Sequence, residues 1–195
     1  MAADLPRVMF DDADAFARWI VTEGPAAGGV WLVYAKKNAG VRTITHREAV
    51  DVALCHGWID GPARGVDDRF TSLRFTPRRT RSVWSAINAE RVGELIAEGR
   101  MTPAGMAEVE RARADGRWDA AYAPPSRMQP TASLRAALDA NPDAAATFAG
   151  LSAAERYSIN HRLHVLRTDA AKAKRIAAYI AALKRGESPH PPRGR

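Results

Sequence analysis

Arginine and tryptophan side chains gather between residues 55 and 88, where they could bind an anion. Guanidinium groups bind phosphate and carboxylate through paired hydrogen bonds, and an indole ring offers a flat wall for a ring or a cation. Ser82 is expected to cap a helix whose first N–H groups would add further donors. We therefore expect a ligand site here. Its candidate ligand-binding residues are Trp58, Asp60, Arg74, Arg78, Arg79, Ser82, Trp84 and Asn88.

The same arginines also have a structural interpretation. Carboxylates lie within or just beyond this stretch, at Asp60, Asp67, Asp68 and Glu90. Ion pairs with them could tie a hairpin to the helix that follows it. Because ion-pair networks imitate functional sites, both interpretations stay open at the level of sequence.

His56 and Asp60 form a candidate catalytic pair. A carboxylate can orient an imidazole that acts as a general base, which would suit a small-molecule or drug-modifying enzyme. The alternative role of His56 is to cap the C-terminal end of a helix. Cys55 is a weaker nucleophile candidate, since a cysteine near a helix end is more commonly a small buried hydrophobic residue.

The C-terminal end of the chain is basic and suggests a third function. Residues 156–195 carry ten Lys or Arg and two Asp or Glu, a net charge of +8. Such a surface attracts nucleic acid, although a solvated helical face has the same composition. The side chains that could contact phosphates are Arg156, Arg162, Arg167, Lys172, Lys174 and Arg175.

We expect no cofactor and no metal. The glycine-containing segment Gly24–Gly29 lacks the Lys-Ser/Thr ending of a phosphate-binding loop. His161 and His164 are spaced so that both could reach one metal ion, but no third or fourth ligand is apparent near them.

The composition indicates a soluble protein of one domain, or of one domain with a small addition. The chain has 195 residues, 46% of them hydrophobic, and a net charge of +7. No run of about 18 apolar residues is present, so we expect no membrane span. The N-terminus lacks the basic and apolar regions of a secretion signal, and one cysteine excludes an internal disulfide. These features favour a cytoplasmic location.

Local patterns predict an α+β fold with a small antiparallel sheet packed by helices, followed by a helical C-terminal segment. An apolar run predicts a buried strand over residues 30–35, and residues 58–60 and 69–76 are typical of a hairpin. Turn residues from Asp60 to Asp68 would join its strands. Helix starts are predicted at Asp11 or Asp12, Thr45, Ser82, Thr102, Ser133, Ser152 and Thr168.

These elements predict four segments. Residues 1–118 would form the α+β core domain, and residues 119–130 a proline-containing linker. Residues 131–187 would form the helical C-terminal segment. Residues 188–195 are expected to be a disordered tail.

Several motifs resemble the bacterial YdeI/OmpD-associated, or bacteriocin-protection, family. The resemblance covers nearly the whole chain, from about Phe16 to Gly186, and includes a basic last helix over residues 168–185. The motifs are Trp58-Ile-Asp-Gly61, Arg74-Phe-Thr-Pro-Arg-Arg79, Ser82-Val-Trp-Ser85 with Asn88, and Gly99-Arg-Met-Thr-Pro-Ala-Gly105. The first two motifs are quite specific when they occur together.

This resemblance implies a link to tolerance of bacteriocins or cationic antimicrobial peptides and to outer-membrane proteins. It implies no catalytic mechanism. We therefore expect a non-enzymatic bacterial stress or antimicrobial-tolerance protein that binds an anionic small molecule or an acidic protein partner through the arginine and tryptophan residues. An enzyme using His56 and Asp60 and nucleic-acid binding by the C-terminal helices are the alternatives.

Overall fold

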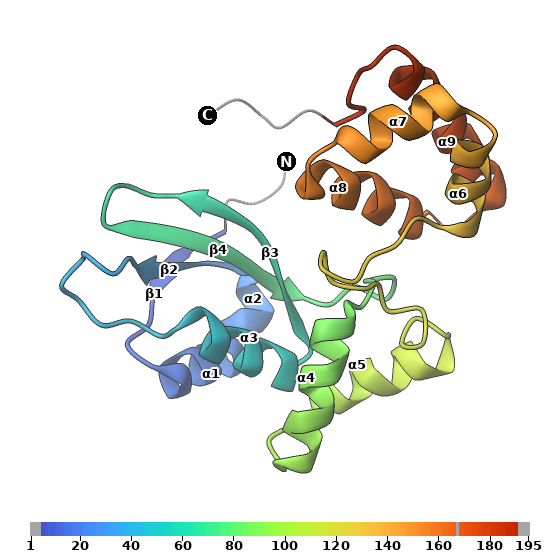
Figure 1. Cartoon of the computed structure of the whole chain (residues 1–195). Coiled ribbons are helices and arrows are strands. Elements are labelled where there is room, and N and C mark those ends of the chain that lie inside the picture. Colours follow the sequence, from blue (N-terminus) through green and yellow to red (C-terminus); the bar gives the residue numbers. More distant parts are fainter. Residues whose placement is uncertain (1–4, 167, 191–195) are drawn as a thin grey trace. The chain divides into compact units, whose positions relative to one another are not determined.

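The chain divides into two compact units, residues 1–120 and 121–195, which are described separately (Figure 1). The structure is a computed structural model that describes residues 5–166 and 168–190. The first unit holds the sheet and five helices of the described residues, and the second holds four helices. This architecture confirms the predicted α+β class.

A four-stranded mixed sheet with the order β1-β2-β4-β3 forms the centre of the first unit. Strand β1 (Arg7–Met9) runs parallel to β2 (Val30–Ala35), and the other neighbours are antiparallel. The hairpin consists of β3 (Trp58–Gly65) and β4 (Phe70–Pro77). The sequence did not predict β1, because three residues are too few to show an alternating pattern.

Helices α1 (Ala13–Thr22), α2 (Gly24–Ala27) and α3 (His46–Cys55) lie on one side of this sheet (Figure 1). The predicted caps are present. Asp12 accepts a hydrogen bond from the backbone N–H of Ala15, and Thr45 and Glu48 form a complete capping box. The apolar faces of these helices meet the sheet in one hydrophobic core.

The strands alternate between this core and the opposite face of the sheet. Val30, Leu32 and Tyr34 lie on the core face, and β4 places Phe75 opposite Val30 and Leu73 opposite Leu32. Trp31 lies on the opposite face, where the guanidinium of Arg64 stacks 4.4 Å from its ring centroid. Both faces of β2 are thus shielded, which agrees with its nearly continuous apolar sequence.

The hairpin differs from its prediction at the start. The segment Asp60-Gly61-Pro62 is not a turn, because β3 continues through a bulge between Asp60 and Ala63 and ends at Gly65. Gly61 allows a close approach at this bulge, since a Cβ atom there would lie 3.2 Å from Nε of Arg74. The chain reverses further on, where the Asp67 carboxylate accepts hydrogen bonds from the N–H groups of Arg69 and Phe70.

Helices α4 (Ala86–Ala97) and α5 (Pro103–Ala114) complete the first unit. The prediction that Ser82 caps α4 is wrong, because Ser85 is the N-cap and accepts from the N–H of Asn88. Ser82 instead accepts a hydrogen bond from the N–H of Arg79 within the preceding turn. Two serines three residues apart both match the N-cap preference, and local sequence cannot choose between them.

An ion pair ties α3 to α4. Arg91 donates two hydrogen bonds to the Asp51 carboxylate, from Nε at 2.7 Å and from Nη2 at 2.6 Å. Burial raises the pKa of Asp51, but the hydrogen bonds from Arg91 and the charges of Arg91 and Arg100 outweigh burial and hold that pKa below its usual value.

The second unit is a helical cluster around its own core. It contains α6 (Ala132–Asp139), α7 (Pro142–Gly150), α8 (Ala153–His164) and α9 (Asp169–Lys184). Helix α7 was not predicted, because Asn141-Pro142 indicated only the end of α6, whereas Pro142 also begins the next helix. The largest fully buried side chains of this core are Leu134, Ile159, Leu163 and Leu183.

The end of the described chain contacts this cluster. His190 Nε2 lies 2.8 Å from the hydroxyl of Tyr179 on α9. Of the expected tail, residues 191–195 lie outside the described residues. Within the described ranges, no helix is both long and apolar enough to cross a bilayer.

Replacing Asp51 with Ala should lower the free energy of unfolding by about 3 kcal/mol, because the partly buried Arg91 loses its buried partner. Urea denaturation at neutral pH measures this loss. The control is Glu94→Ala, which removes an Arg91 partner that is 60% exposed and should cost less than about 1 kcal/mol.

The same pair predicts a pH dependence. Because folding lowers the pKa of Asp51, its contribution is complete above the unfolded pKa of about 4 and is lost as the pH falls through the folded pKa. The stability difference between the native protein and Asp51→Ala should therefore shrink below about pH 4. A constant difference between pH 7 and pH 3 would contradict this role of Asp51.

Candidate functional site

The centre of the arginine and tryptophan cluster is buried. Trp84 is only 2% exposed and Arg78 only 6%. The Arg78 guanidinium lies 3.5 Å from the ring centroid of Trp84, and the Trp118 ring packs on Trp84 with centroids 4.9 Å apart. Arg78 also donates from its backbone N–H to Gly57 and from Nη1 to Val83. These contacts make Arg78 and Trp84 parts of the packing among the segment between β4 and α4, Gly57 and Trp118.

Trp58 is buried in the core of the first unit. Its ring meets Trp19 edge to face, with centroids 6.1 Å apart and an interplanar angle of 76°. Gly24 of α2 lies against the same ring, where a Cβ atom would come within 2.8 Å of Trp58. The indole ring therefore packs α1 and α2 onto the sheet and offers no exposed wall to a ligand.

The remaining members of the predicted set have different surroundings. Arg74 and Arg79 are exposed, and Ser82 caps a turn. Asp60 and Asn88 do come together, because both line a cavity of about 380 Å³ between α3 and α4. That cavity also contains Asp51, Glu90, Glu94, Arg47 and Arg91. Its charges are thus mixed, which does not favour an anion.

His56 lies at the C-terminal end of α3, in the capping position that was the alternative to its catalytic role. It is the C-cap of α3, and its backbone N–H donates to the carbonyls of Val52 and Ala53. Burial lowers the pKa of His56 and raises the pKa of the Cys55 thiol. The cavity that Asp60 lines does not include His56 among its lining residues. This cavity therefore does not bring the two members of the proposed acid–base pair together.

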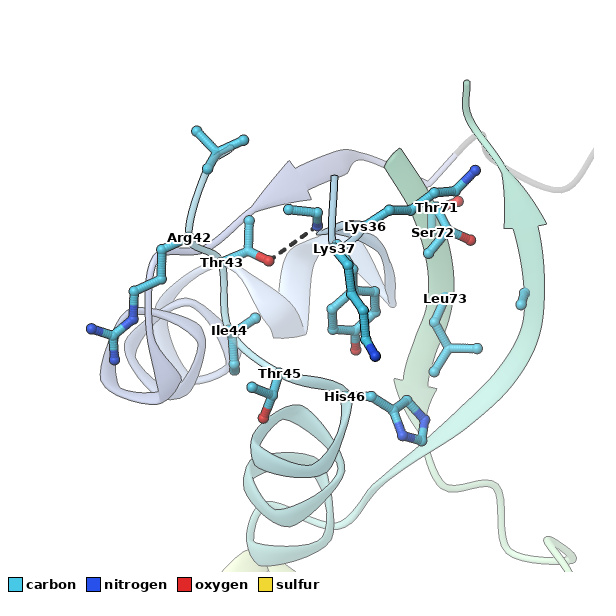
Figure 2. A pocket seen from close by; sticks show the side chains of 14 residues that line it. Lys36, Lys37, Arg42, Thr43, Ile44, Thr45, His46, Thr71, Ser72 and Leu73 are labelled. Carbon is cyan, nitrogen blue, oxygen red and sulfur yellow. Dashed lines mark hydrogen bonds between the residues drawn. The ribbon is translucent and has the colours of Figure 1, made fainter. Parts of the chain in front are cut away.

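A larger pocket lies where the sequence predicted only a turn and a helix start. Its volume is about 590 Å³, and it opens between the β2–α3 loop and strand β4 (Figure 2). Figure 2 shows Lys37 and His46 reaching into the space between the loop and β4, with Arg42 directed away from it. Hydroxyl groups of the lining come from Thr43 and Thr45 on the loop side and from Thr71 and Ser72 on β4.

The loop that carries Lys37 is held in place by hydrogen bonds. Thr43 Oγ1 accepts from the N–H of Ala35, and Arg69 donates to the carbonyl of Ala39. The Lys36 ammonium donates to the carbonyl of Asp67 at 2.8 Å. Arg69, which belongs to the arginine-rich stretch of residues 55–88, thus supports the loop and does not itself line the pocket.

The lining of this pocket is basic and apolar and contains no Asp or Glu among the described residues. Lys37 makes no hydrogen bond or ion pair within the described part of the chain. Tyr34 is buried, and its hydroxyl has no hydrogen-bond partner among these residues. Burial and then the negative charge of Asp60 raise the pKa of Tyr34, so the hydroxyl keeps its proton at neutral pH.

A partial signal for this pocket existed in the sequence. The segment Lys36–Arg42 carries three cations and no carboxylate, directly after a buried strand. The pocket itself depends on β4 lying beside that loop, and this pairing joins distant parts of the chain.

The basic residues of the second unit have mixed surroundings. Arg156 donates from Nη1 to the carbonyls of Ala149 and Leu151, and Lys172 lies 3.8 Å from Asp169. Arg167 lies outside the described residues. His161 packs between rings, with centroids 4.7 Å from Tyr122 and 5.5 Å from Tyr157. In the described ranges, no three His, Cys, Asp or Glu side chains are arranged to hold a metal ion.

Two protein families match the chain, one in each unit. Residues 8–108 match the family described as a domain of unknown function, DUF8412. Because this match spans slightly more than half of the chain, the protein belongs to that family. Residues 128–186 match the family described as bacteriocin-protection, YdeI or OmpD-associated.

The second match confirms the resemblance noted from sequence and supports a stress-related role. It covers only the helical segment. The Trp-Ile-Asp-Gly and Phe-Thr-Pro-Arg-Arg motifs lie instead in the region that the first family covers. No curated protein and no solved structure matches the chain.

Arg78→Ala should destabilise the protein by about 2 kcal/mol, because it removes a desolvated cation–π contact and leaves a cavity beside Trp84. The matched control is Arg79→Ala, an exposed neighbour whose loss should change stability by less than about 0.5 kcal/mol. Urea denaturation followed by tryptophan fluorescence measures both. Equal effects of the two substitutions would contradict the structural role of Arg78.

Proposed function

We propose that the protein is a cytoplasmic stress or antimicrobial-tolerance protein that binds an anionic small molecule in the pocket of Figure 2. The observation that carries this proposal is the position of Lys37, an ammonium group that reaches into a pocket without carboxylates. A cation in such surroundings attracts an anion and has no competing partner.

The pocket suits a small organic anion better than a bare inorganic ion. Its volume of about 590 Å³ lies within the range of small-molecule sites. Val41, Ile44 and Leu73 contribute apolar surface, while hydroxyl groups and Lys37 contribute polar contacts. A carboxylate attached to a small apolar group would therefore match both parts of the lining.

The proposed ligand does not bind at Trp58 and Trp84, the tryptophans that the sequence predicted as ligand-binding residues. Trp58, Arg78 and Trp84 are buried in packing contacts and have little surface to offer a ligand. A link to antimicrobial tolerance is supported by the family match of residues 128–186. Ligand capture by the first unit would then be one contribution to tolerance.

The proposal is tested with benzoate, a carboxylate on a small apolar ring, by isothermal titration calorimetry at low salt. Lys37→Ala should weaken benzoate binding at least about tenfold, because it removes a charge-assisted hydrogen bond. The matched control is Lys36→Ala. It removes the same charge from the adjacent residue, which also lines the pocket, and should weaken binding much less than Lys37→Ala, because its ammonium is already bonded to the Asp67 carbonyl.

Raising the ionic strength should also weaken benzoate binding to the native protein, because salt screens the attraction between the carboxylate and Lys37. The proposal would be overturned by equal losses in the two lysine variants. It would also be overturned if benzoate and inorganic phosphate both failed to bind the native protein.

A further inference from the structure

A second pocket lies within the second unit and has a different chemistry. Its volume is about 530 Å³, and it opens between the segment 125–130 and helices α7 and α8. Phe148, Tyr157 and Met128 give it an aromatic and apolar wall. The prolines at 125 and 130 stiffen the loop on its other side, since a proline ring limits backbone rotation.

Asn160 is the unusual member of this lining. Its side chain is only 3% exposed, and its amide oxygen has no hydrogen-bond partner among the described residues. A buried amide oxygen without a donor is unfavourable and is uncommon in folded proteins. Asn160 lies one helical turn from Arg156 and Tyr157, so the three side chains share one face of α8.

The charge of Arg156 is already compensated at the edge of this pocket. Its Nη1 donates to the carbonyls of Ala149 and Leu151, which lie at the C-terminal end of α7. The end of a helix carries a partial negative charge that favours such a cation. Burial also raises the pKa of Tyr157, which agrees with a wall that is partly removed from water. An anion is therefore not the expected ligand of this pocket.

We propose that this pocket is a binding site for a neutral small molecule that combines an aromatic ring with an amide N–H. The ring would pack against Phe148, Tyr157 and Met128, and the N–H would donate to the amide oxygen of Asn160. This site is independent of the anion site, because all its lining residues belong to the second unit.

The first test compares two probes on the native full-length protein by isotope-edited NMR titration. N-benzylacetamide carries a benzyl ring and one amide N–H, and in N-benzyl-N-methylacetamide a methyl group replaces the hydrogen of that N–H. The first should shift amide signals of α8 and of residues 125–130 saturably, with a dissociation constant on the order of millimolar for so small a molecule. The methylated probe should bind at least about tenfold more weakly, because it has no donor for Asn160.

The second test removes the acceptor. Asn160→Leu keeps a similar side-chain volume, so the proposal expects it to lose the preference for N-benzylacetamide over the methylated probe. Its melting temperature should not fall, because an apolar group replaces a buried polar atom that lacks a partner. The control is Asn141→Leu in the same unit, which should lower the melting temperature because Asn141 Nδ2 donates to the carbonyl of Ala137.

The outcomes are decisive in each direction. Equal affinities of the two probes for the native protein, or an undiminished preference in Asn160→Leu, would overturn the proposal. Absence of saturable shifts with N-benzylacetamide would overturn it as well. A failure of benzoate to bind would leave this site untouched, because that ligand addresses the first unit.

Discussion

The antiparallel pairing of β2 with β4 is the constraint on which the first unit depends. The register places Leu73 opposite Leu32 and Phe75 opposite Val30. These four apolar side chains therefore lie on the same face of the sheet, in the core that also contains residues of α1 and α3. A shift of one residue would expose this core and bury Arg74. The same register puts Thr71 opposite Tyr34, and thereby brings β4 beside the loop that carries Lys37. The register of β2 with β4 therefore determines both the composition of the core and the position of the pocket.

Arginine has more than one role in this chain. Arg78 is buried on Trp84, Arg64 stacks on Trp31, Arg69 holds the β2–α3 loop, and Arg91 joins α3 to α4. Each of these guanidinium groups uses its flat face or its fixed set of donors. Those of Arg64, Arg69 and Arg91 connect parts of the chain that are distant in sequence, whereas that of Arg78 contacts the nearby Val83 and Trp84. Three of the six arginines between residues 55 and 88, namely Arg64, Arg69 and Arg78, are thus used within the fold. The ammonium of Lys37, on a short loop outside that stretch, is a better candidate for a ligand contact.

The sequence predicts those elements that are determined by interactions between residues close together in the chain. The capping boxes at Thr45 and Ser152 form as expected, because each involves residues three positions apart. The strand β1, the bulge after Asp60 and the exact start of α4 were missed, because strand pairing or packing determines them. Burial of Arg78 also needs Trp84 and Trp118 to meet, and no local pattern contains that contact. The pocket around Lys37 belongs to the same class of long-range features.

The two units share one physical feature at their pockets. Tyr34 in the first and Asn160 in the second each place a buried polar atom without a partner, among the described residues, beside a cavity. Such an atom weakens the native state when the cavity holds no matching group. A ligand that supplies the missing partner binds the folded unit and not the unfolded chain, so it shifts the folding equilibrium by mass action. Under the two proposals, each ligand would therefore stabilise its own unit separately, and the two ligands would be of different chemical classes.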